Sequence, residues 1–222
     1  MGASGREPGR GLRRAPRVST GVRSGSAAAR VLPRAVRVGR PELHASAEFS
    51  PCGLHRLRLD RWWSDEPRAL ICGANPSKAG AEKHDPTVWR IVELLHGRPG
   101  IGGFTLVNVE TYIATDPADL VRWCDRQDLD VLQHVRRTNL ARIRALSAEA
   151  AVRIVAWGAL AAPGLHTNRI IAALSLDGTH ALHAFELTGE GAPKHPLARG
   201  RHRIAGGQPL IVWRAAEKQE VR

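Results

Sequence analysis

Three short segments of the chain contain side chains that can bind a polar ligand and stabilise charge on it. An apolar run ends in a turn at Asn75–Ser77, a second apolar run contains Asn108, and His195 lies in a Lys-His-Pro segment. An Asn side chain offers a donor and an acceptor to an amide edge, and a His can stabilise negative charge through a hydrogen bond. This chemistry requires a fold that brings the three segments together.

The chain alternates apolar runs with segments of helical pattern, which indicates the elements that hold these residues. Asp85-Pro86 and Asp116-Pro117 predict helix starts, with Asp as the cap and Pro in the first turn. Because strands that alternate with helices need crossover connections, we predict an α/β fold, a three-layer sandwich with a mostly parallel central sheet. The expected strands are 54–63, 68–73, 104–109, 152–157, 181–187 and 209–213, and the expected helices include 88–96, 129–146 and 168–174.

Polar or small residues follow most of the predicted strands. The carboxyl ends of parallel strands meet at one edge of a sheet, and in open α/β sheets ligands bind at that edge. We therefore expect one cleft there. The residues predicted to line it are Gly73, Asn75, Pro76, Ser77, Asp85, Asn108, Tyr112, Lys194, His195 and Pro196.

Five motifs follow one another along the chain, at Asn75–Ser77, Asp85–Thr87, Thr115–Pro117, Trp157–Gly158 and His195–Leu197. In their content and order the chain resembles the DUF1643 family, which is uncharacterised. Members of that family often have Tyr after His-Pro-Leu, whereas Ala198 stands at that position here. This difference puts one aromatic wall of the site in doubt.

The order of the segments is also similar to that of the uracil-DNA glycosylase superfamily. The shared order is Gly-x-Asn-Pro, an apolar strand ending in Asn, another ending in Trp-Gly, and then His-Pro. The resemblance implies a glycosylase-like fold in which Asn75 positions water, Asn108 binds the edge of a base, and His195 stabilises charge on the leaving base. The implied reaction is hydrolysis of an N-glycosidic bond in nucleic acid or in a nucleotide.

The first loop lacks a carboxylate that could take a proton from the attacking water. Asn75 can orient water but cannot accept its proton, so Asp85 is the candidate base. An aromatic side chain such as Tyr112 can stack on a bound ring. Structural roles are the alternatives for three of these residues: Asn75 as a turn former only, Asp85 as an N-cap only, and Trp157 as a core residue.

A second function fits the same residues, namely a non-catalytic module that binds a nucleotide or nucleic acid. The missing first-loop carboxylate favours it. A different hydrolase is a third possibility, although the sequence contains no Gly-x-Ser-x-Gly elbow and no Gly-rich phosphate loop. The histidines share no metal-ligand spacing, so we expect neither a metal nor a cofactor. The expected partner is a nucleobase, a nucleotide or nucleic acid, and the oligomeric state is left open.

Positive charge is concentrated at the N-terminus. The formal net charge of the 222 residues is +12, and residues 1–40 contain ten arginines against the single acid Glu7, so ten minus one gives +9 in that segment. We predict a disordered Arg-rich segment at 1–48 and an α/β domain at 50–215. Three interpretations of the segment compete: a basic arm that holds phosphate, an organellar transit peptide, and an over-extended translation start.

The cysteines and the hydropathy pattern bear on the compartment. Cys52, Cys72 and Cys124 are widely spaced, which indicates neither a disulfide framework nor a zinc site. Cys72 lies in an apolar strand and is predicted to be a core residue. The N-terminal segment contains no apolar run long enough for a signal peptide or a membrane span. These features favour a cytoplasmic protein without a membrane partner.

Overall fold

Seven strands form one mixed sheet in the described part of the chain. The structure is a computed structural model, and it describes residues 39–77, 79–80, 85–158 and 164–217. Of the Arg-rich segment predicted at 1–48, residues 1–38 therefore lie outside the described residues. The strands are β1 (His44–Phe49), β2 (Arg56–Trp62), β3 (Arg68–Gly73), β4 (Gly103–Asn108), β5 (Val152–Val155), β6 (Leu182–Ala184) and β7 (Ile211–Arg214).

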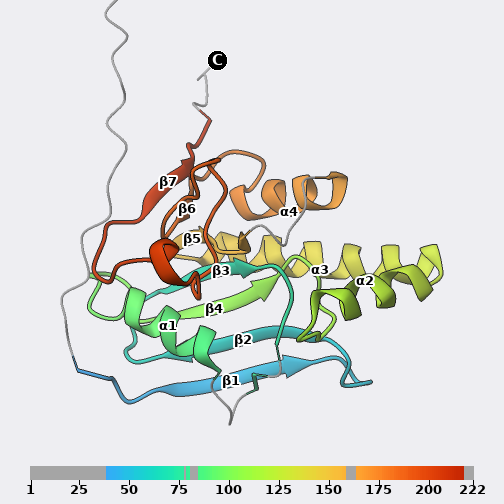
Figure 1. The fold of residues 1–222 in the computed structure, drawn as a ribbon, viewed down its shortest axis with the longest axis horizontal. Helices are drawn as coiled ribbons and strands as arrows, with labels where there is room; N and C mark the ends of the chain where they lie inside the picture. The colour runs from blue at the N-terminus through green and yellow to red at the C-terminus, as the bar shows by residue number, and fades with distance from the viewer. Residues whose placement is uncertain (1–38, 78, 81–84, 159–163, 218–222) are drawn as a thin grey trace, which may run out of the picture.

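The strand order is β1-β2-β4-β3-β5-β6-β7, which Figure 1 shows from the bottom of the view to the top. The four central strands β4, β3, β5 and β6 are parallel, whereas β1, β2 and β7 pair in antiparallel fashion. The prediction of a mostly parallel sheet is therefore correct only for the centre. At the β1–β2 edge, the short connections from β1 to β2 and from β2 to β3 leave no room for a crossover helix, which explains why β1 and β2 each reverse direction, because parallel strands need long connections.

Four α-helices flank this sheet within the described residues. They are α1 (Pro86–Leu95), α2 (Pro117–Arg126), α3 (Leu129–Glu149) and α4 (Leu165–Ser175), and a short 3₁₀ turn follows at Gly200–His202. All four occur where the sequence predicts helices. None of these described helices combines the length and the apolar composition that crossing a membrane requires.

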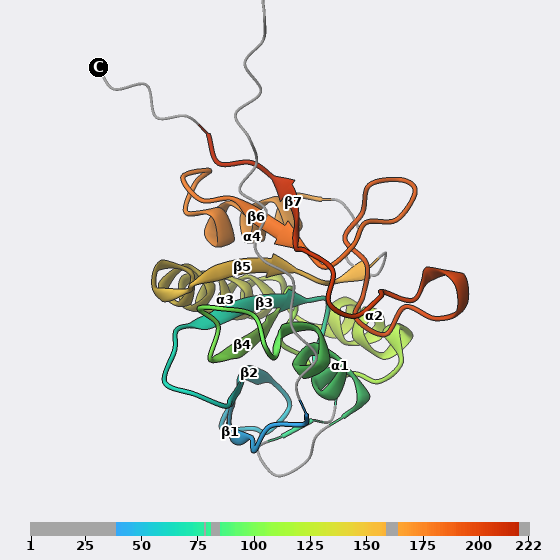
Figure 2. The same cartoon turned by 90° about the vertical axis from the view of Figure 1, so that its left-hand side faces the viewer.

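The helices lie on both faces of the sheet (Figures 1 and 2). On one face, α1 packs its buried residues against side chains such as Ile71 and Leu106. On the other face, α3 and α4 contribute Ile143 and Ile170 to a second cluster that contains Cys72. Cys72 is fully buried, so its prediction as a core residue is confirmed. Each face of the central strands is thus covered by apolar packing.

The start of α1 matters for the site, and its sequence explains why it forms there. The Asp85 side chain accepts a hydrogen bond from the Val88 amide at 2.8 Å, and Pro86 occupies the first helical position. This arrangement satisfies a free amide of the first turn and is typical of a stable helix start. The prediction of Asp85 as the N-cap is therefore confirmed. Asp116 caps α2 in the same way, through the Ala118 amide.

The second helix of the chain is far less embedded than the first. None of the residues of α2 is buried, and Figure 1 shows it beside the N-terminal part of α3, beyond the sheet. At the other edge, β1 begins at His44, a few residues before the predicted start of the domain at residue 50. Hydrogen-bonded pairing with β2 orders these residues even though they alternate exposed and half-buried positions.

Candidate functional site

A cavity of about 200 Å³ lies on the α1 face of the sheet, at the carboxyl ends of the central strands. Its apolar floor contains Ile71, Leu106 and Ala156, and Ile91 of α1 closes one side. The wall also contains Gly73, Asn75, Ser77, Asp85, Asn108, His195 and Pro196, all of them predicted to line a cleft, together with Arg56, Thr87 and Thr115. The three segments singled out by their chemistry therefore meet in one place.

The first loop is shaped by close backbone contacts. Asn75 donates from Nδ2 to the Ala114 carbonyl at 2.7 Å, and the Ala114 amide donates to the Pro76 carbonyl at 3.1 Å. The Asn75 amide group therefore ties two loops together, and its Oδ1 is the atom left to accept hydrogen bonds. Gly73 provides space, because a Cβ at that position would lie 2.8 Å from Asn108 Nδ2. Gly73, which precedes the Asn-Pro turn, therefore leaves the space that the side-chain amide of Asn108 occupies.

Asn108 is buried, and protein contacts fix its orientation. Arg56 donates from Nη2 to Asn108 Oδ1 at 3.1 Å. Since a guanidinium can only donate, the amide oxygen must face Arg56 and the Nδ2 group must face Gly73. Asn139 of α3 holds the strand end from behind, donating to the Asn108 carbonyl at 2.9 Å. Among the described residues, no group accepts a hydrogen bond from Asn108 Nδ2.

Arg56 is a site residue that the sequence analysis missed. Its side chain is 3 % exposed, and it donates to the Ala79 carbonyl at 3.2 Å in addition to Asn108. Its Nε is buried without a partner, and Arg56 makes no ion pair with any residue that the structure describes. Burial lowers the pKa of Arg56 to about 10, while the charge of Asp85 opposes the shift. At neutral pH Arg56 is therefore a buried cation.

The topology explains why Arg56 was missed. It begins β2, and β2 runs antiparallel to β4, so the start of β2 lies at the edge where the parallel strands end. Only the ends of strands were considered in predicting the cleft. The sequence does show a charged residue, Arg56, near the start of a predicted strand, next to Leu57. Without the strand order, this position could not be assigned to the cavity.

Ser77 and Asp85 form a hydrogen-bonded pair at the N-terminus of α1. The Ser77 hydroxyl donates to Asp85 Oδ2, and the other carboxylate oxygen accepts the Val88 amide. Asp85 is therefore both a helix cap and a wall of the cavity. The Ser77 oxygen retains its capacity to accept a hydrogen bond from water or ligand.

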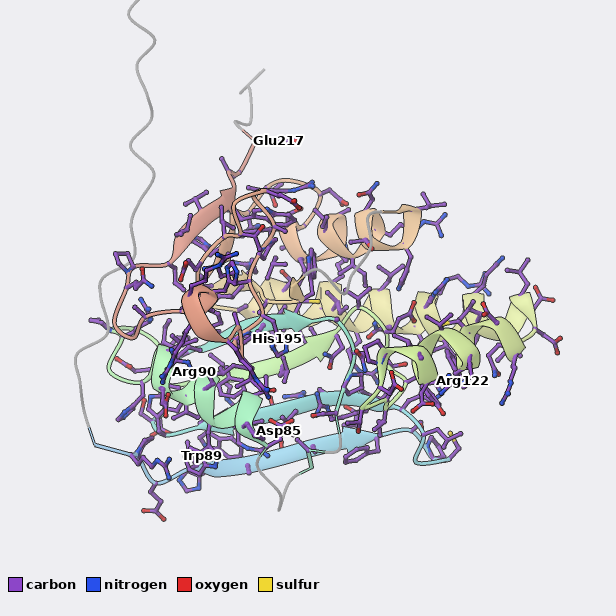
Figure 3. All side chains as sticks on the ribbon, viewed as in Figure 1. Asp85, Trp89, Arg90, Arg122, His195 and Glu217 are labelled. Atoms are coloured by element: carbon purple, nitrogen blue, oxygen red, sulfur yellow. The ribbon has the colours of Figure 1, made fainter. Side chains whose placement is uncertain are left out.

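His195 is held with one ring nitrogen engaged. Its Nδ1 accepts the Leu197 amide at 3.1 Å, so the neutral ring carries its proton on Nε2. Burial lowers the pKa of His195, and the charge of Asp85 opposes this only in part. The ring is therefore a neutral donor at pH 7. Figure 3 labels His195 and Asp85, and shows His195 in the segment that lies above the start of α1 in that view.

The Trp-Gly motif makes room for the histidine. Gly158 has a φ of +66°, which disfavours other residues, and a Cβ there would lie 3.1 Å from the His195 Cβ. Trp157 packs in the core on the opposite face, with its ring 5.6 Å from that of Trp213. This confirms Trp157 as a core residue and assigns the glycine, rather than the tryptophan, to the site.

Three predicted residues do not line the cavity. Tyr112 stacks on Trp123 with ring centroids 4.8 Å apart, so it belongs to an aromatic cluster at α2 and is not placed to stack on a ligand. Lys194 is buried and forms an ion pair with Glu186, which anchors the His195 segment. Pro76 supplies only its carbonyl to the loop contact with Ala114.

No group of three or more His, Cys, Asp or Glu side chains in the described residues is arranged to hold a metal ion. The polar groups of the cavity instead suit a small organic ligand. Pockets that bury drug-sized molecules occupy about 300–1,000 Å³, so this smaller cavity suits a ligand of about the size of a nucleobase.

The family model described as "Protein of unknown function (DUF1643)" matches residues 56–197. The matched span begins at Arg56 and ends one residue after Pro196, so it contains every cavity residue named above. No curated protein and no solved structure matches the chain.

Proposed function

This chain belongs to the DUF1643 family, and from that premise we propose that its cavity binds a nucleobase and that the protein hydrolyses an N-glycosidic bond. The observation that carries the proposal is the meeting of Asn75, Asn108 and His195 in one nucleobase-sized cavity, although they come from distant segments. The substrate is a base in nucleic acid or in a nucleotide.

The reaction requires above all that the negative charge on the leaving base be stabilised. Cleavage of the bond gives the sugar oxocarbenium character and leaves negative charge on the base. A neutral His195 with its proton on Nε2 is suited to donate a hydrogen bond to that charge, and such donors act most strongly in a site that excludes water. His195 is therefore the proposed electrophile, and Asn108 is the residue proposed to bind the edge of the base.

The proposed place of water activation is the Ser77–Asp85 pair in the cavity wall. The Asn75 Oδ1 and the Ser77 hydroxyl are acceptors that can align a water molecule. When that water adds to the sugar, its proton can pass through the Ser77 hydroxyl to Asp85, which replaces the missing first-loop carboxylate. Asp85 is the proposed base in this scheme.

The fold is compatible with this proposal at a coarse level. An α/β sheet with helices on both faces and a site at the strand ends is what a three-layer, glycosylase-like arrangement would have. The superfamily resemblance itself rests on the order of the motifs alone. Because one fold serves many functions, the case rests on the cavity residues rather than on the fold.

A non-catalytic binding module is the second candidate, and one observation favours it. Both oxygens of Asp85 already accept hydrogen bonds, one from Ser77 and one from Val88, so neither oxygen is left without a protein donor to take a proton from water. In that case the cavity would bind a base or nucleotide without turnover.

One experiment separates the two candidates. The protein is incubated with uracil-, hypoxanthine-, xanthine- and alkylbase-containing DNA, RNA and nucleotides, and released bases are measured by mass spectrometry. We expect release from at least one substrate and its loss in His195→Ala. The matched control is His202→Gln, which changes an exposed histidine outside the cavity and should leave release unchanged.

If nothing is released but nucleotides raise the melting temperature, the binding module is correct. Release that His195→Ala leaves unchanged would contradict the assigned role of His195. The DNA, RNA and nucleotide arms of the panel identify whether the substrate is a polymer.

A further inference from the structure

The polar groups of the cavity have hydrogen-bond directions that the protein itself fixes. Asn108 presents Nδ2, because Arg56 occupies its oxygen. His195 presents Nε2–H, because its Nδ1 accepts the Leu197 amide. Arg56 can only donate. Three of the cavity's polar side chains are therefore donors, and they come from β2, β4 and the His195 segment.

The position of Arg56 has a cost that a merely structural residue would avoid. Within the described residues Arg56 is a buried cation without an ion pair, which is unfavourable, and its Nε lacks a partner there as well. An apolar side chain of similar size would fill the same volume without the desolvation of a charge. The contact that Arg56 makes with the amide of Asn108 is the one that determines what a ligand meets.

We propose that Arg56 is a specificity-determining residue, which orients Asn108 so that the cavity accepts rings carrying a carbonyl oxygen and rejects rings carrying an exocyclic amino group at that edge. The inference rests on the proposed function, since it names the class of base that the same cavity takes. Arg56 acts through Asn108 and through its positive charge, and it is a positioning residue rather than a catalytic one.

The selectivity follows from pairing donors with acceptors. A carbonyl oxygen accepts from Asn108 Nδ2 and lies in the field of the Arg56 charge, whereas an amino group would face a donor with a donor. A buried donor left unpaired in this way is costly, and sites built on hydrogen bonds discriminate strongly for this reason. Uracil and hypoxanthine carry a carbonyl where cytosine and adenine carry an amino group, so each pair differs at the edge that matters.

Binding of these matched pairs tests the inference without any need for turnover. Uracil against cytosine and hypoxanthine against adenine are titrated by calorimetry, as free bases and as nucleoside monophosphates. We expect the carbonyl member of a pair to bind at least about tenfold more tightly, which corresponds to about 1.4 kcal/mol. In Arg56→Gln the amide of Asn108 is free to turn, so this ratio should fall toward one.

Two further variants sharpen the result. Asn108→Asp replaces the donor by an acceptor that pairs with Arg56, so the carbonyl preference should disappear. Arg153→Gln is the matched control, because Arg153 is also buried but donates to Ser147, outside the cavity. The control should retain the wild-type ratio.

The outcomes distinguish this inference from the proposed function. Equal or tighter binding of cytosine and adenine by the wild-type protein overturns the inference and leaves a base-binding cavity in place. An unchanged ratio in a folded Arg56→Gln protein removes Arg56 from the explanation. Absence of binding by every base and nucleotide overturns the proposed function and the inference together. The wild-type comparison tests the carbonyl preference even if a variant fails to fold, and a folded Arg56→Gln protein tests the role of Arg56.

Discussion

Two buried polar groups in the same sheet differ in how far their hydrogen bonds are satisfied. At the cavity, Arg56 has no carboxylate partner among the described residues and its Nε makes no hydrogen bond. Elsewhere in the sheet, Asp60 on β2 is 1 % exposed, and both of its carboxylate oxygens accept hydrogen bonds from neighbouring side chains. We call this second group the Asp60 cluster; its members are Asp60, Ser46, Arg58, Arg68 and Thr105.

The Asp60 cluster shows what a structural solution looks like on the same strand. Burial alone would raise the pKa of Asp60, but hydrogen bonds from Arg58 and Thr105 outweigh it, and its pKa lies below the usual range. Every carboxylate oxygen is occupied by protein donors, so the cluster has no need of a ligand. A buried charge beside a cavity that has no ion pair among the residues the structure covers therefore identifies the site better than burial or charge does alone.

The largest expected effect on stability is at the Asp60 cluster. Asp60→Ala removes an acceptor that five donor contacts share, and leaves Thr105 buried without that partner. We expect the free energy of unfolding to fall by about 3 kcal/mol, as for other buried ionic networks that lose one member. Urea denaturation measures it. A loss below about 1 kcal/mol would place this cluster among weak surface ion pairs.

A smaller effect is expected at Gly158, where backbone conformation and the site are coupled. Gly158→Ala forces a side chain into a φ of +66° and toward His195, and should cost about 1–2 kcal/mol of stability. It should also weaken base binding or release, because the His195 segment must shift.

Gly191→Ala is the control for Gly158. Its φ is +81°, but a Cβ there would meet open space. Both variants should lose a similar amount of stability, and only Gly158→Ala should lose binding. Equal loss of binding in both would show that strain, rather than contact with His195, is responsible.

Arg56→Met tests the functional half of the comparison, and its expected effect on stability is smaller again. The variant leaves Asn108 Oδ1 and the Ala79 carbonyl without the donor that Arg56 supplies, but it also removes a buried charge that has no ion pair in the described part of the chain. These terms offset each other, so we expect the free energy of unfolding to change by less than about 1 kcal/mol. A thermal melt checks this. A loss as large as that of Asp60→Ala would make Arg56 a structural residue.

The smallest effect is a difference in pH dependence between the two groups. Burial lowers the pKa of His195, so below the unfolded value of about 6.5 the unfolded chain binds protons that the folded chain does not. Stability therefore falls as the pH drops from 7 toward 5, and burial of His55 and His183 acts in the same direction. The lowered pKa of Asp60 instead removes stability only as the pH falls below about 4.

Denaturation curves at pH 7, 5.5 and 3.5 separate the two ranges. His195→Gln should reduce the loss of stability between pH 7 and 5.5 and leave the acid range unchanged. An identical slope in wild type and His195→Gln would indicate that His195 is not effectively buried.

The sequence predicted those features that depend on neighbouring residues. Asp85 and Asp116 followed by Pro marked two helix starts correctly, and the polar strand ends led to Asn75, Asn108 and His195 in one cavity. Features that depend on strand order were missed. Nothing local indicates that β2 pairs with β4 in antiparallel fashion, and this pairing is what delivers Arg56 to the site.

Tyr112 shows the same limit from the other side. It follows β4 and was therefore expected at the cleft, yet it stacks on Trp123 of α2. The direction in which a side chain leaves a strand end depends on the packing partner that lies nearby, and this partner came from a helix whose position the sequence pattern does not give. Prediction from pattern was thus reliable for which segments meet and unreliable for which side chains face inward.

The contacts around α1 have a consequence for folding while the chain is being synthesised. Arg56, at the first edge of the cavity, leaves the ribosome long before His195, and Arg90 of α1 donates to the carbonyl of Ile204, farther still along the chain. Domains generally fold as units during synthesis, N-terminal domains first, so this domain cannot complete its cavity until the segment that carries His195 has been made. The cavity is therefore among the last parts of the domain to be completed, and a ligand that fills it would bind only chains whose synthesis has passed residue 196.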